Sequence, residues 1–289
     1  MSDKPSILVQ LDTDPAPSVF DRVVAVDSGV QHLFSYSGVT PQNVVPYVHG
    51  CIFTRKELNR TAIFIGGSDV AAGEAVLAEV KKQFIPQWGL SVSVMLDSNG
   101  SNTTASAAVR DAGRHLDLTQ ARSLVLGGTG PVGQRVARLL ARQGGLVRIG
   151  SREKSRAESV CQAIRAQVPN ARLEAVAVAG SSDGPRVLDG CNLVVAAGAA
   201  GAVLLPKKVR EAAKDLRVAI DLNAVPPVGI EGVGVGDRAK EHGGVICYGA
   251  IGVGATKMKA HKAAVAQLFQ TNNAVLDIEE IYAIALKLP

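Results

Sequence analysis

A glycine-rich segment in the middle of the chain has the residue types and spacing of a phosphate-binding turn. Gly128-x-Gly130-x-x-Gly133 follows the apolar run 124–126 and precedes 134–142, where apolar residues recur with helical spacing. A strand, a glycine turn and a helix in this order typically hold the pyrophosphate of a dinucleotide. Gly128 would allow the tight turn, Gly130 the approach of a phosphate, and Gly133 close packing of the helix on the strand.

The helix after this turn would bind the phosphates through its first N–H groups and the positive end of its dipole. Pro131 suits the first helical position, because the N–H that proline lacks is not needed there. A purely structural glycine turn is the alternative. The sequence predicts cofactor binding by the consecutive residues Gly128, Thr129, Gly130, Pro131, Val132 and Gly133.

The residues that follow the next predicted strand, 146–150, indicate which dinucleotide is bound. An NAD site usually has Asp or Glu there, to accept hydrogen bonds from the ribose hydroxyls. This chain has Ser151 and Arg152, whose hydroxyl and guanidinium groups suit a phosphate monoester. Lys154 or Ser155 would assist. We therefore expect NADP; NAD is the alternative if Arg152 is a solvated loop residue and the glutamate after it takes the acidic role.

The sequence carries no signature of proton-transfer or metal chemistry. The five histidines are scattered, without metal-ligand spacing and without a Ser-His-Asp or Cys-His pattern. Oxidation of an alcohol moves a proton as well as a hydride, and usually requires a His, Lys or Tyr. Oxidation of a methylene group between two nitrogens requires no proton transfer, because the nitrogens delocalise the resulting cation. Such an enzyme mainly holds two flat rings at reacting distance.

Two polar loops at predicted strand ends offer hydrogen-bonding groups for a heterocycle. Asp12 and Asp14 follow the strand predicted at 7–11, and the loop 97–104 follows the strand predicted at 91–96. The alternative is ordinary helix capping, with Ser101 or Asn102 as the cap of the next helix. The candidates in the second loop are Asp97, Asn99, Ser101, Asn102 and Thr103.

Lys257 follows the glycine-rich segment 249–254 and is expected near the start of a helix from about 254 to 269. A lysine at that position opposes the helix dipole. This local conflict suggests a role in a site, although the glycines could instead serve packing.

The rest of the chain supplies the elements that must position these residues. Strand and helix signals alternate from the strand predicted at 7–11 to the one at 245–248, where we expect the sheet to end. Helices are expected at 19–27, capped by Ser18, and from Thr40-Pro41 onward. Repeated units of this kind predict a parallel sheet with both faces covered. A ligand should sit at the carboxyl ends of the strands.

Length and composition limit the alternatives. A chain of 289 residues allows about two domains. Hydrophobic residues make up 47% and charged residues 20%, as in ordinary globular proteins. The net charge of +5 is mild and forms no basic stripe, so nucleic acid is not an expected partner. Four distant cysteines indicate reduced thiols, and no signal peptide or membrane span is visible. We expect a cytoplasmic protein without a membrane partner.

Several segments together resemble the NADP-dependent methylene-tetrahydromethanopterin dehydrogenases of methylotrophic and related bacteria, over nearly the whole chain. The resemblance implies an oxidoreductase that converts the methylene group to the methenyl cation in one-carbon metabolism, usually during formaldehyde oxidation. Some members of this family use NAD, and some accept methylene-tetrahydrofolate. The segments are 12–14 with 17–21, 95–104, 128–133, 221–227, and 249–254 with 257–261.

The resemblance also implies how the α/β chain is divided. An N-terminal α/β pterin domain, 1–106, completed by C-terminal helices 257–289, would face a Rossmann-type, doubly wound NADP domain, 107–256, across a cleft. Lys257 would contact the pterin and matter for activity, and the loop 97–104 would line the pterin site. A homo-oligomer is also implied. Three strand-terminal residues would lie near the nicotinamide: Ala197, Gly198 and Asn223.

Two other readings remain open from the sequence. A methylene-tetrahydrofolate dehydrogenase would use the same chemistry. A non-catalytic NADP-binding sensor would need only the glycine turn.

Overall fold

The computed structural model describes residues 4–180 and 183–289. The chain forms two compact units: unit 1 comprises Met1–Thr103 and Met258–Pro289, and unit 2 comprises Thr104–Lys257. The chain leaves unit 1 within helix α4 (Ser101–Gly113) and returns to it within helix α9 (Ala250–Gln267). Unit 1 is therefore discontinuous in sequence, whereas unit 2 is continuous.

Unit 1 is built on a five-stranded parallel sheet in the order β12-β4-β3-β1-β2. Numbered along the chain from one edge, this order is 2-1-3-4-5, that of flavodoxin-like sheets, in which the winding reverses between β1 and β3. The strands are β1 (Ile7–Asp12), β2 (His32–Tyr36), β3 (Thr61–Gly66), β4 (Ser93–Leu96) and β12 (Val275–Leu276).

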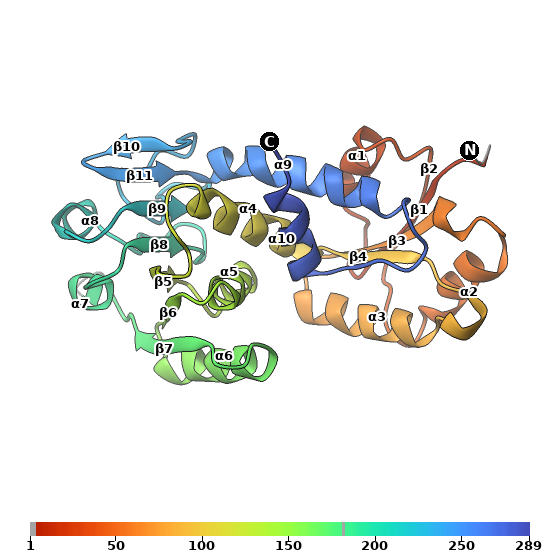
Figure 1. Ribbon diagram of the computed structural model, residues 1–289, viewed down its shortest axis with the longest axis horizontal. Helices are drawn as coiled ribbons and strands as arrows, with labels where there is room; N and C mark the ends of the chain where they lie inside the picture. Colours follow the sequence, from red (N-terminus) through yellow and green to blue (C-terminus); the bar gives the residue numbers. More distant parts are fainter. Residues whose placement is uncertain (1–3, 181–182) are drawn as a thin grey trace. The chain divides into compact units, whose positions relative to one another are not determined.

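Helices cover both faces of this sheet, because successive side chains of a strand point to opposite faces. On β3, Ile63 packs in one cluster with Val80 of α3, whereas its neighbour Phe64 packs in another with Val265 of α9. Figure 1 shows α3 along one face of the sheet and α9 along the other. One face is covered by α2 (Val45–Phe53) and α3 (Val70–Lys82), the other by α1 (Val19–Asp27), α9 and α10 (Ile278–Leu286).

Unit 2 contains a seven-stranded sheet in the order β10-β11-β9-β8-β5-β6-β7. Apart from β10, its strands are parallel and follow the 3-2-1-4-5-6 order of the Rossmann fold, which reverses between β5 and β8. The strands are β5 (Arg122–Leu126), β6 (Leu146–Ser151), β7 (Arg172–Ala177), β8 (Leu193–Ala196), β9 (Val218–Asp221), β10 (Lys240–His242) and β11 (Val245–Tyr248).

The central strands of unit 2 are buried on both faces, as their continuous apolar runs predict. Leu124 and its neighbour Val125 are both fully buried. Leu124 packs with Val187 of α7 and with the nearby Val209 of α8. The helices are α5 (Pro131–Arg142), α6 (Lys154–Gln167), α7 (Gly184–Leu188) and α8 (Lys207–Ala212). Within the described residues, no helix is both long and apolar enough to cross a membrane.

One predicted element boundary is wrong, and one strand was not predicted. The helix expected from Thr40-Pro41 begins only at Val45, because Asn43 closes a turn by accepting from the N–H of Thr40 at 2.8 Å. The strand expected at 245–248 is β11, the last of its sheet along the chain, but the unpredicted strand β10 precedes it and pairs antiparallel with it at the sheet edge. Gly243 and Gly244 join these strands with φ of +63° and +80°, the left-handed backbone that a two-residue hairpin turn requires.

Candidate functional site

The glycine turn lies at the carboxyl end of β5, next to the loop that follows β8 and thus where the winding of the unit 2 sheet reverses. Gly127 has a φ of +68°, in the left-handed region. A Cβ atom on Gly127 would lie 2.5 Å from the Cα of Gly198. The prediction that Gly128 makes the tight turn is therefore wrong, since Gly127 makes it. In the sequence, the adjacent pair Gly127-Gly128 was the signal that could have indicated Gly127.

The other glycines of the turn differ in whether neighbouring atoms leave room for a side chain. A Cβ on Gly128 would lie 2.8 Å from a methyl carbon of Ile149, and one on Gly133 would overlap the carbonyl oxygen of Gly127. Gly133 therefore allows the helix to pack against the turn, as expected. A Cβ on Gly130 would make only ordinary contacts, the nearest at 3.4 Å. The backbone at Gly130 is therefore open to an approaching ligand.

Helix α5 begins at Pro131, and its N-cap residue, Gly130, has no side chain to cap the first N–H groups. The N–H groups of the first turn, including those of Val132 and Gly133, have no carbonyl partner within the helix. The side-chain amide of Gln134 donates to the carbonyl of Thr129 at 2.7 Å and so holds the turn in place. These groups and the helix dipole fit an anion such as pyrophosphate.

Strand β6 ends at Ser151, which is buried and whose hydroxyl accepts from the N–H of Glu153 at 3.3 Å. Arg152 is exposed and forms no ion pair or hydrogen bond within the described part of the chain. Glu153 instead accepts from Arg156 at 3.0 Å. Ser155 is exposed in the first turn of α6. The guanidinium of Arg152 is therefore available to a phosphate, whereas the nearby carboxylate is already paired.

Ala197 and Gly198 directly follow β8, at the same edge of the sheet as the glycine turn. Asn223 follows β9 and is buried, and its N–H donates to the carboxylate of Asp221 at 3.0 Å. Its side-chain amide donates to the carbonyl of Pro227 at 3.1 Å. Asn223 thus stabilises its own loop.

Asp221 is a site-edge residue that the sequence analysis did not single out. Its carboxylate, at the end of β9, also accepts from the N–H of Ile230 at 2.8 Å. Burial raises the pKa of this carboxyl despite the hydrogen bonds it accepts. Its sequence signals were its position at the end of an apolar run and its place in the segment 221–227 that carries the family resemblance.

The reversal point of the unit 1 sheet carries the first polar loop. Asp12 is fully buried, and its carboxylate accepts from the N–H groups of Asp14 and Ser18, both at 3.0 Å. Asp14 is only partly buried, and its carboxylate accepts from the N–H and the hydroxyl of Ser68, both at 2.9 Å. Asp12 therefore shapes its own loop, whereas Asp14 joins the loops after β1 and β3.

The second polar loop caps helix α4 in an unexpected way. The Asp97 carboxylate accepts from the N–H groups of Asn102 and Thr103 at 2.9 and 3.0 Å, and from the Thr103 hydroxyl at 2.6 Å. The expectation that Ser101 or Asn102 is the cap is therefore wrong. Asn102 donates instead to the carboxylate of Asp277 at 2.9 Å. All four loop residues are buried.

Asn99 differs from the other predicted residues of this loop because it is exposed. Its φ of +55° is left-handed, a conformation that asparagine tolerates better than most residues. Its N–H donates to the carbonyl of Gly67 at 2.7 Å, which ties the loop after β4 to the loop after β3. Asn99 and Asp14 are thus the predicted residues of unit 1 that reach the surface at this edge.

Lys257 lies about two turns inside helix α9, which begins at Ala250 rather than near 254. The helix continues through Gly252, where a Cβ would overlap the carbonyl oxygen of Asp237. The dipole argument for Lys257 is therefore wrong. Lys257 is partly buried, one residue after Thr256, whose hydroxyl donates to Asp111 at 3.0 Å.

Two of the histidines have structural partners, and one cysteine is neutral because it is buried. The Nε2 of His115 lies 2.8 Å from the Tyr248 hydroxyl, and the Nε2 of His242 lies 2.7 Å from the Asp237 carboxylate. Burial raises the pKa of Cys51 to about 12, which keeps this thiol neutral. Within residues 4–180 and 183–289, no cluster of three or more His, Cys, Asp or Glu could hold a metal ion.

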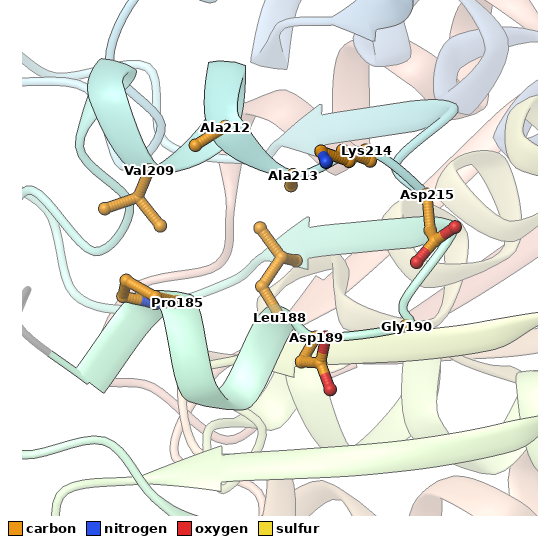
Figure 2. A pocket seen from close by; sticks show the side chains of 9 residues that line it. All are labelled: Pro185, Leu188, Asp189, Gly190, Val209, Ala212, Ala213, Lys214 and Asp215. Atoms are coloured by element: carbon orange, nitrogen blue, oxygen red, sulfur yellow. The ribbon is translucent and has the colours of Figure 1, made fainter.

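A cavity of about 230 Å³ lies elsewhere in unit 2. Figure 2 shows the side chains of Leu188 and Val209, from α7 and α8, pointing into it. Asp189 and Asp215, which also line it, precede β8 and β9. The cavity is therefore at the amino ends of these strands, opposite the glycine turn, and is not the predicted cofactor site.

The fold has counterparts among solved structures. The 5-ketofructose reductase of Gluconobacter sp. strain CHM43 has a TM-score of 0.57, 14% identity, and coverage of 98% of this chain and 99% of that chain. Quinate dehydrogenase from Corynebacterium glutamicum, in complex with NAD, has a TM-score of 0.53, 14% identity, and coverage of 99% and 100%. The fold and the glycine turn together define a two-unit α/β protein with a Rossmann-type unit.

Relatives in sequence identify the family. The family model "Methylene-tetrahydromethanopterin dehydrogenase, N-terminal" matches residues 19–99. The bifunctional protein MdtA of Methylorubrum extorquens AM1 is 42% identical over 285 residues, 96% of this chain and 97% of that protein. The NAD(P)-dependent methylenetetrahydromethanopterin dehydrogenase of the same organism is 30% identical over 297 residues, 98% of each. The chain belongs to the methylenetetrahydromethanopterin dehydrogenase family.

Proposed function

We propose that this protein is an oxidoreductase that oxidises methylene-tetrahydromethanopterin to methenyl-tetrahydromethanopterin with NADP, as part of formaldehyde oxidation. The observation that carries the proposal is the alignment of 98% of the chain with a relative named for NAD(P)-dependent oxidation of this substrate. Two sheets, each with one reversal of winding, supply two ligand-binding edges.

We assign the dinucleotide to residues 107–256. The open backbone at Gly130 and the first turn of α5 suit the pyrophosphate. The unpaired guanidinium of Arg152, beside Ser151, suits the 2′-phosphate that distinguishes NADP from NAD. We propose that Ala197 and Gly198 lie beside the nicotinamide. Asn223 stabilises its own loop at the same edge of the sheet. When bound, NADP supplies the hydride acceptor.

We assign the pterin to the carboxyl edge of the unit 1 sheet, residues 1–106 with 257–289. Asp14 and Asn99 reach the surface there and are the proposed direct contacts. The buried side chains shape the loops from behind, since their hydrogen-bonding groups are engaged with the protein. These supporting residues are Asp12, Asp97, Ser101, Asn102 and Thr103. Lys257 is proposed to contact the substrate on the basis of the family resemblance.

The reaction requires the side chains mainly to position the substrate. The C–H bond of the methylene group breaks with both electrons leaving on the hydrogen, and the two adjacent nitrogens share the positive charge that remains. No proton leaves the substrate in this step. The loops therefore contribute by holding the reacting carbon at a fixed distance and orientation.

The purified protein mixed with NADP and methylene-tetrahydromethanopterin tests the proposal directly. We expect the absorbance band of NADPH to grow, with a kcat/KM at least about tenfold above that for methylene-tetrahydrofolate. A tenfold preference for the folate would make folate the substrate. Absence of NADPH with either compound would favour a sensor.

We further propose a cytoplasmic homo-oligomer. The four cysteines are buried free thiols, which suits a reducing compartment. Helix α1 exposes several apolar side chains, which suits contact with another molecule. Light scattering of the purified protein measures its mass, and a monomer would contradict the oligomer.

A further inference from the structure

The carboxylate of Asp221, the last residue of β9, holds both ends of the loop 222–230. Its Oδ1 accepts from the N–H of Asn223 at 3.0 Å, near the start of the loop, and its Oδ2 accepts from the N–H of Ile230 at 2.8 Å, at the end. Asp221 is 1% exposed, and these hydrogen bonds offset the cost of burying its carboxylate. One side chain therefore fixes where the loop begins and where it ends.

The end of this loop is bound to the segment that follows β8. The carbonyl of Gly229 accepts from the N–H groups of Leu204 and Leu205 at 2.8 and 3.0 Å. Leu205 also forms a parallel bridge with Ile230, and both residues are fully buried. A Cβ atom on Gly229 would lie 2.8 Å from the Oδ1 of Asp221, so the loop backbone packs directly against the carboxylate. The position of the segment after β8 therefore depends on Asp221.

The segment after β8 meets the glycine turn at Gly198. A Cβ atom on Gly198 would lie 2.6 Å from a methyl carbon of Leu204. On the other side, a Cβ atom on Gly127 would lie 2.5 Å from the Cα of Gly198. Gly198 is therefore confined between Leu204 and the turn to which the pyrophosphate is assigned. Because close-packed groups transmit displacements, a shift of Leu204 moves the backbone of Gly198.

We propose that Asp221 is a positioning residue for the nicotinamide end of the cofactor, and that it acts without contacting NADP. By holding the loop 222–230 it fixes Leu204, and Leu204 keeps the backbone of Gly198 at the place to which the nicotinamide is assigned. This inference rests on the proposed function, because it takes NADP as the cofactor. A small misplacement of a reacting ring lowers the rate of transfer strongly.

The adenosine end of NADP provides an internal reference for the test. Arg152, which is assigned to the 2′-phosphate, follows β6, and the strands β8 and β5 lie between β9 and β6 in the sheet. Loss of the Asp221 carboxylate should therefore disturb the nicotinamide end alone. Adenosine 2′,5′-bisphosphate carries the 2′-phosphate but lacks the nicotinamide, so its affinity reports only on the adenosine end.

The variant Asp221→Asn keeps the shape of the side chain but replaces one acceptor oxygen with a donor, so that one N–H of the loop loses its partner. Calorimetry measures the dissociation constants of NADP and of adenosine 2′,5′-bisphosphate. We expect NADP to bind about tenfold more weakly and the bisphosphate to bind within about twofold of the wild type. The rate constant of hydride transfer at saturating NADP should fall about tenfold.

Asp215→Asn, at an exposed residue just before the other end of β9, is the matched control and should change neither dissociation constant. Gly229→Ala places a methyl group against the Asp221 carboxylate without removing it, and should reproduce the pattern of Asp221→Asn. If Asp221→Asn does not fold, Gly229→Ala decides with the same two ligands. Equal weakening of NADP and the bisphosphate would overturn the inference, since Asp221 would then serve the general stability of unit 2. So would unchanged NADP affinity with an unchanged rate of hydride transfer.

Failure of the proposed function gives a different result. In that case the wild-type protein itself forms no NADPH from methylene-tetrahydromethanopterin. If the wild type forms NADPH, and Asp221→Asn binds NADP and transfers hydride as the wild type does, only the role of Asp221 is wrong.

Discussion

Arg152, just before α6, and Arg156, in its first turn, lie four residues apart in sequence but differ in their electrostatic surroundings. Arg156 donates to Glu153 at 3.0 Å, whereas Arg152 is exposed and has no ion pair within the described residues. A phosphate bound to Arg152 would gain a charge-assisted hydrogen bond without breaking one inside the protein. Arg152 is therefore the residue with which to test cofactor preference, and Arg156 is its matched control.

Replacing Arg152 with alanine should weaken NADP binding by about tenfold to a hundredfold, because a charge-assisted hydrogen bond is lost. NAD, which lacks the 2′-phosphate, should bind almost as before. Dissociation constants for both cofactors measure the difference, and Arg156→Ala should change neither. Equal weakening of NADP and NAD by Arg152→Ala would make Arg152 a structural residue.

Replacing Lys257 with alanine should lower kcat for pterin oxidation about tenfold, because a substrate-positioning contact is lost. NADP affinity should be nearly unchanged. Lys259, exposed on the same helix, provides the control variant Lys259→Ala. Normal turnover in Lys257→Ala would remove Lys257 from the site.

At the scale of elements, the loops that position the candidate site are held mainly by buried side chains. Asp97 accepts three hydrogen bonds from the start of α4. Sequence alone predicted polar loops at the correct strand ends, because strands and turns have strong local signals. It could not separate Asp97, which caps a helix, from Asn99, which faces solvent, since both residue types serve caps and ligands.

Asp97→Ala should destabilise unit 1 by about 2 kcal/mol, because it leaves two N–H groups and a hydroxyl without their acceptor. Urea unfolding measures the loss. Asn99→Gly, which keeps the left-handed backbone accessible, should leave the unfolding free energy nearly unchanged and weaken pterin binding. The reverse pattern, with Asn99 stabilising and Asp97 neutral, would contradict these roles.

Asp111 of α4 accepts from Thr256 of α9, and burial raises the pKa of its carboxyl. A raised pKa in the folded state means that Asp111 contributes stability below its ordinary value of 3.8, and that this contribution is lost as pH rises through the folded pKa. Asp111→Asn does not titrate. The unfolding free energy of this variant should therefore improve relative to wild type as the pH rises above 3.8. If urea unfolding shows the same pH dependence of the unfolding free energy for Asp111→Asn and wild type, this prediction is contradicted.

The elements themselves were predictable to different degrees. Strands expected at 7–11 and 91–96 agree with β1 and β4 to within two residues, because continuous apolar runs mark strands buried on both faces. Strand β2 was not predicted, since it lies at the sheet edge with exposed and half-buried residues in alternation. The early start of α9 was missed because glycines at 252 and 254 argue against a helix.

At the scale of the whole molecule, the alternation of strands and helices predicted the α/β class, which the structure and the structural relatives confirm. The compact units divide at 103/104 and 257/258, whereas the resemblance implies 106/107 and 256/257. Composition could not mark these divisions, because α4 and α9 run across them as unbroken helices.

A reaction without a proton relay has a distinct kinetic signature. Deuterium on the methylene carbon should slow hydride transfer. The rate constant of this step, measured under single-turnover conditions, should therefore show a primary isotope effect. The rate of that step should not follow a bell-shaped pH profile, because no general acid or base takes part. Stopped-flow measurement of NADPH across pH tests both expectations. A bell-shaped profile of the isotope-sensitive step would indicate a catalytic acid or base.

The discontinuity of unit 1 has a consequence for biosynthesis. The nascent chain emerges from the ribosome with residues 1–103 first, but α10 and β12, which cover and extend their sheet, are translated last. All of unit 2 is made in the interval and can fold as a contiguous segment. A stop codon at residue 258 would therefore leave unit 2 intact, and would expose the face of β3 on which Phe64 lies to chaperones and proteases.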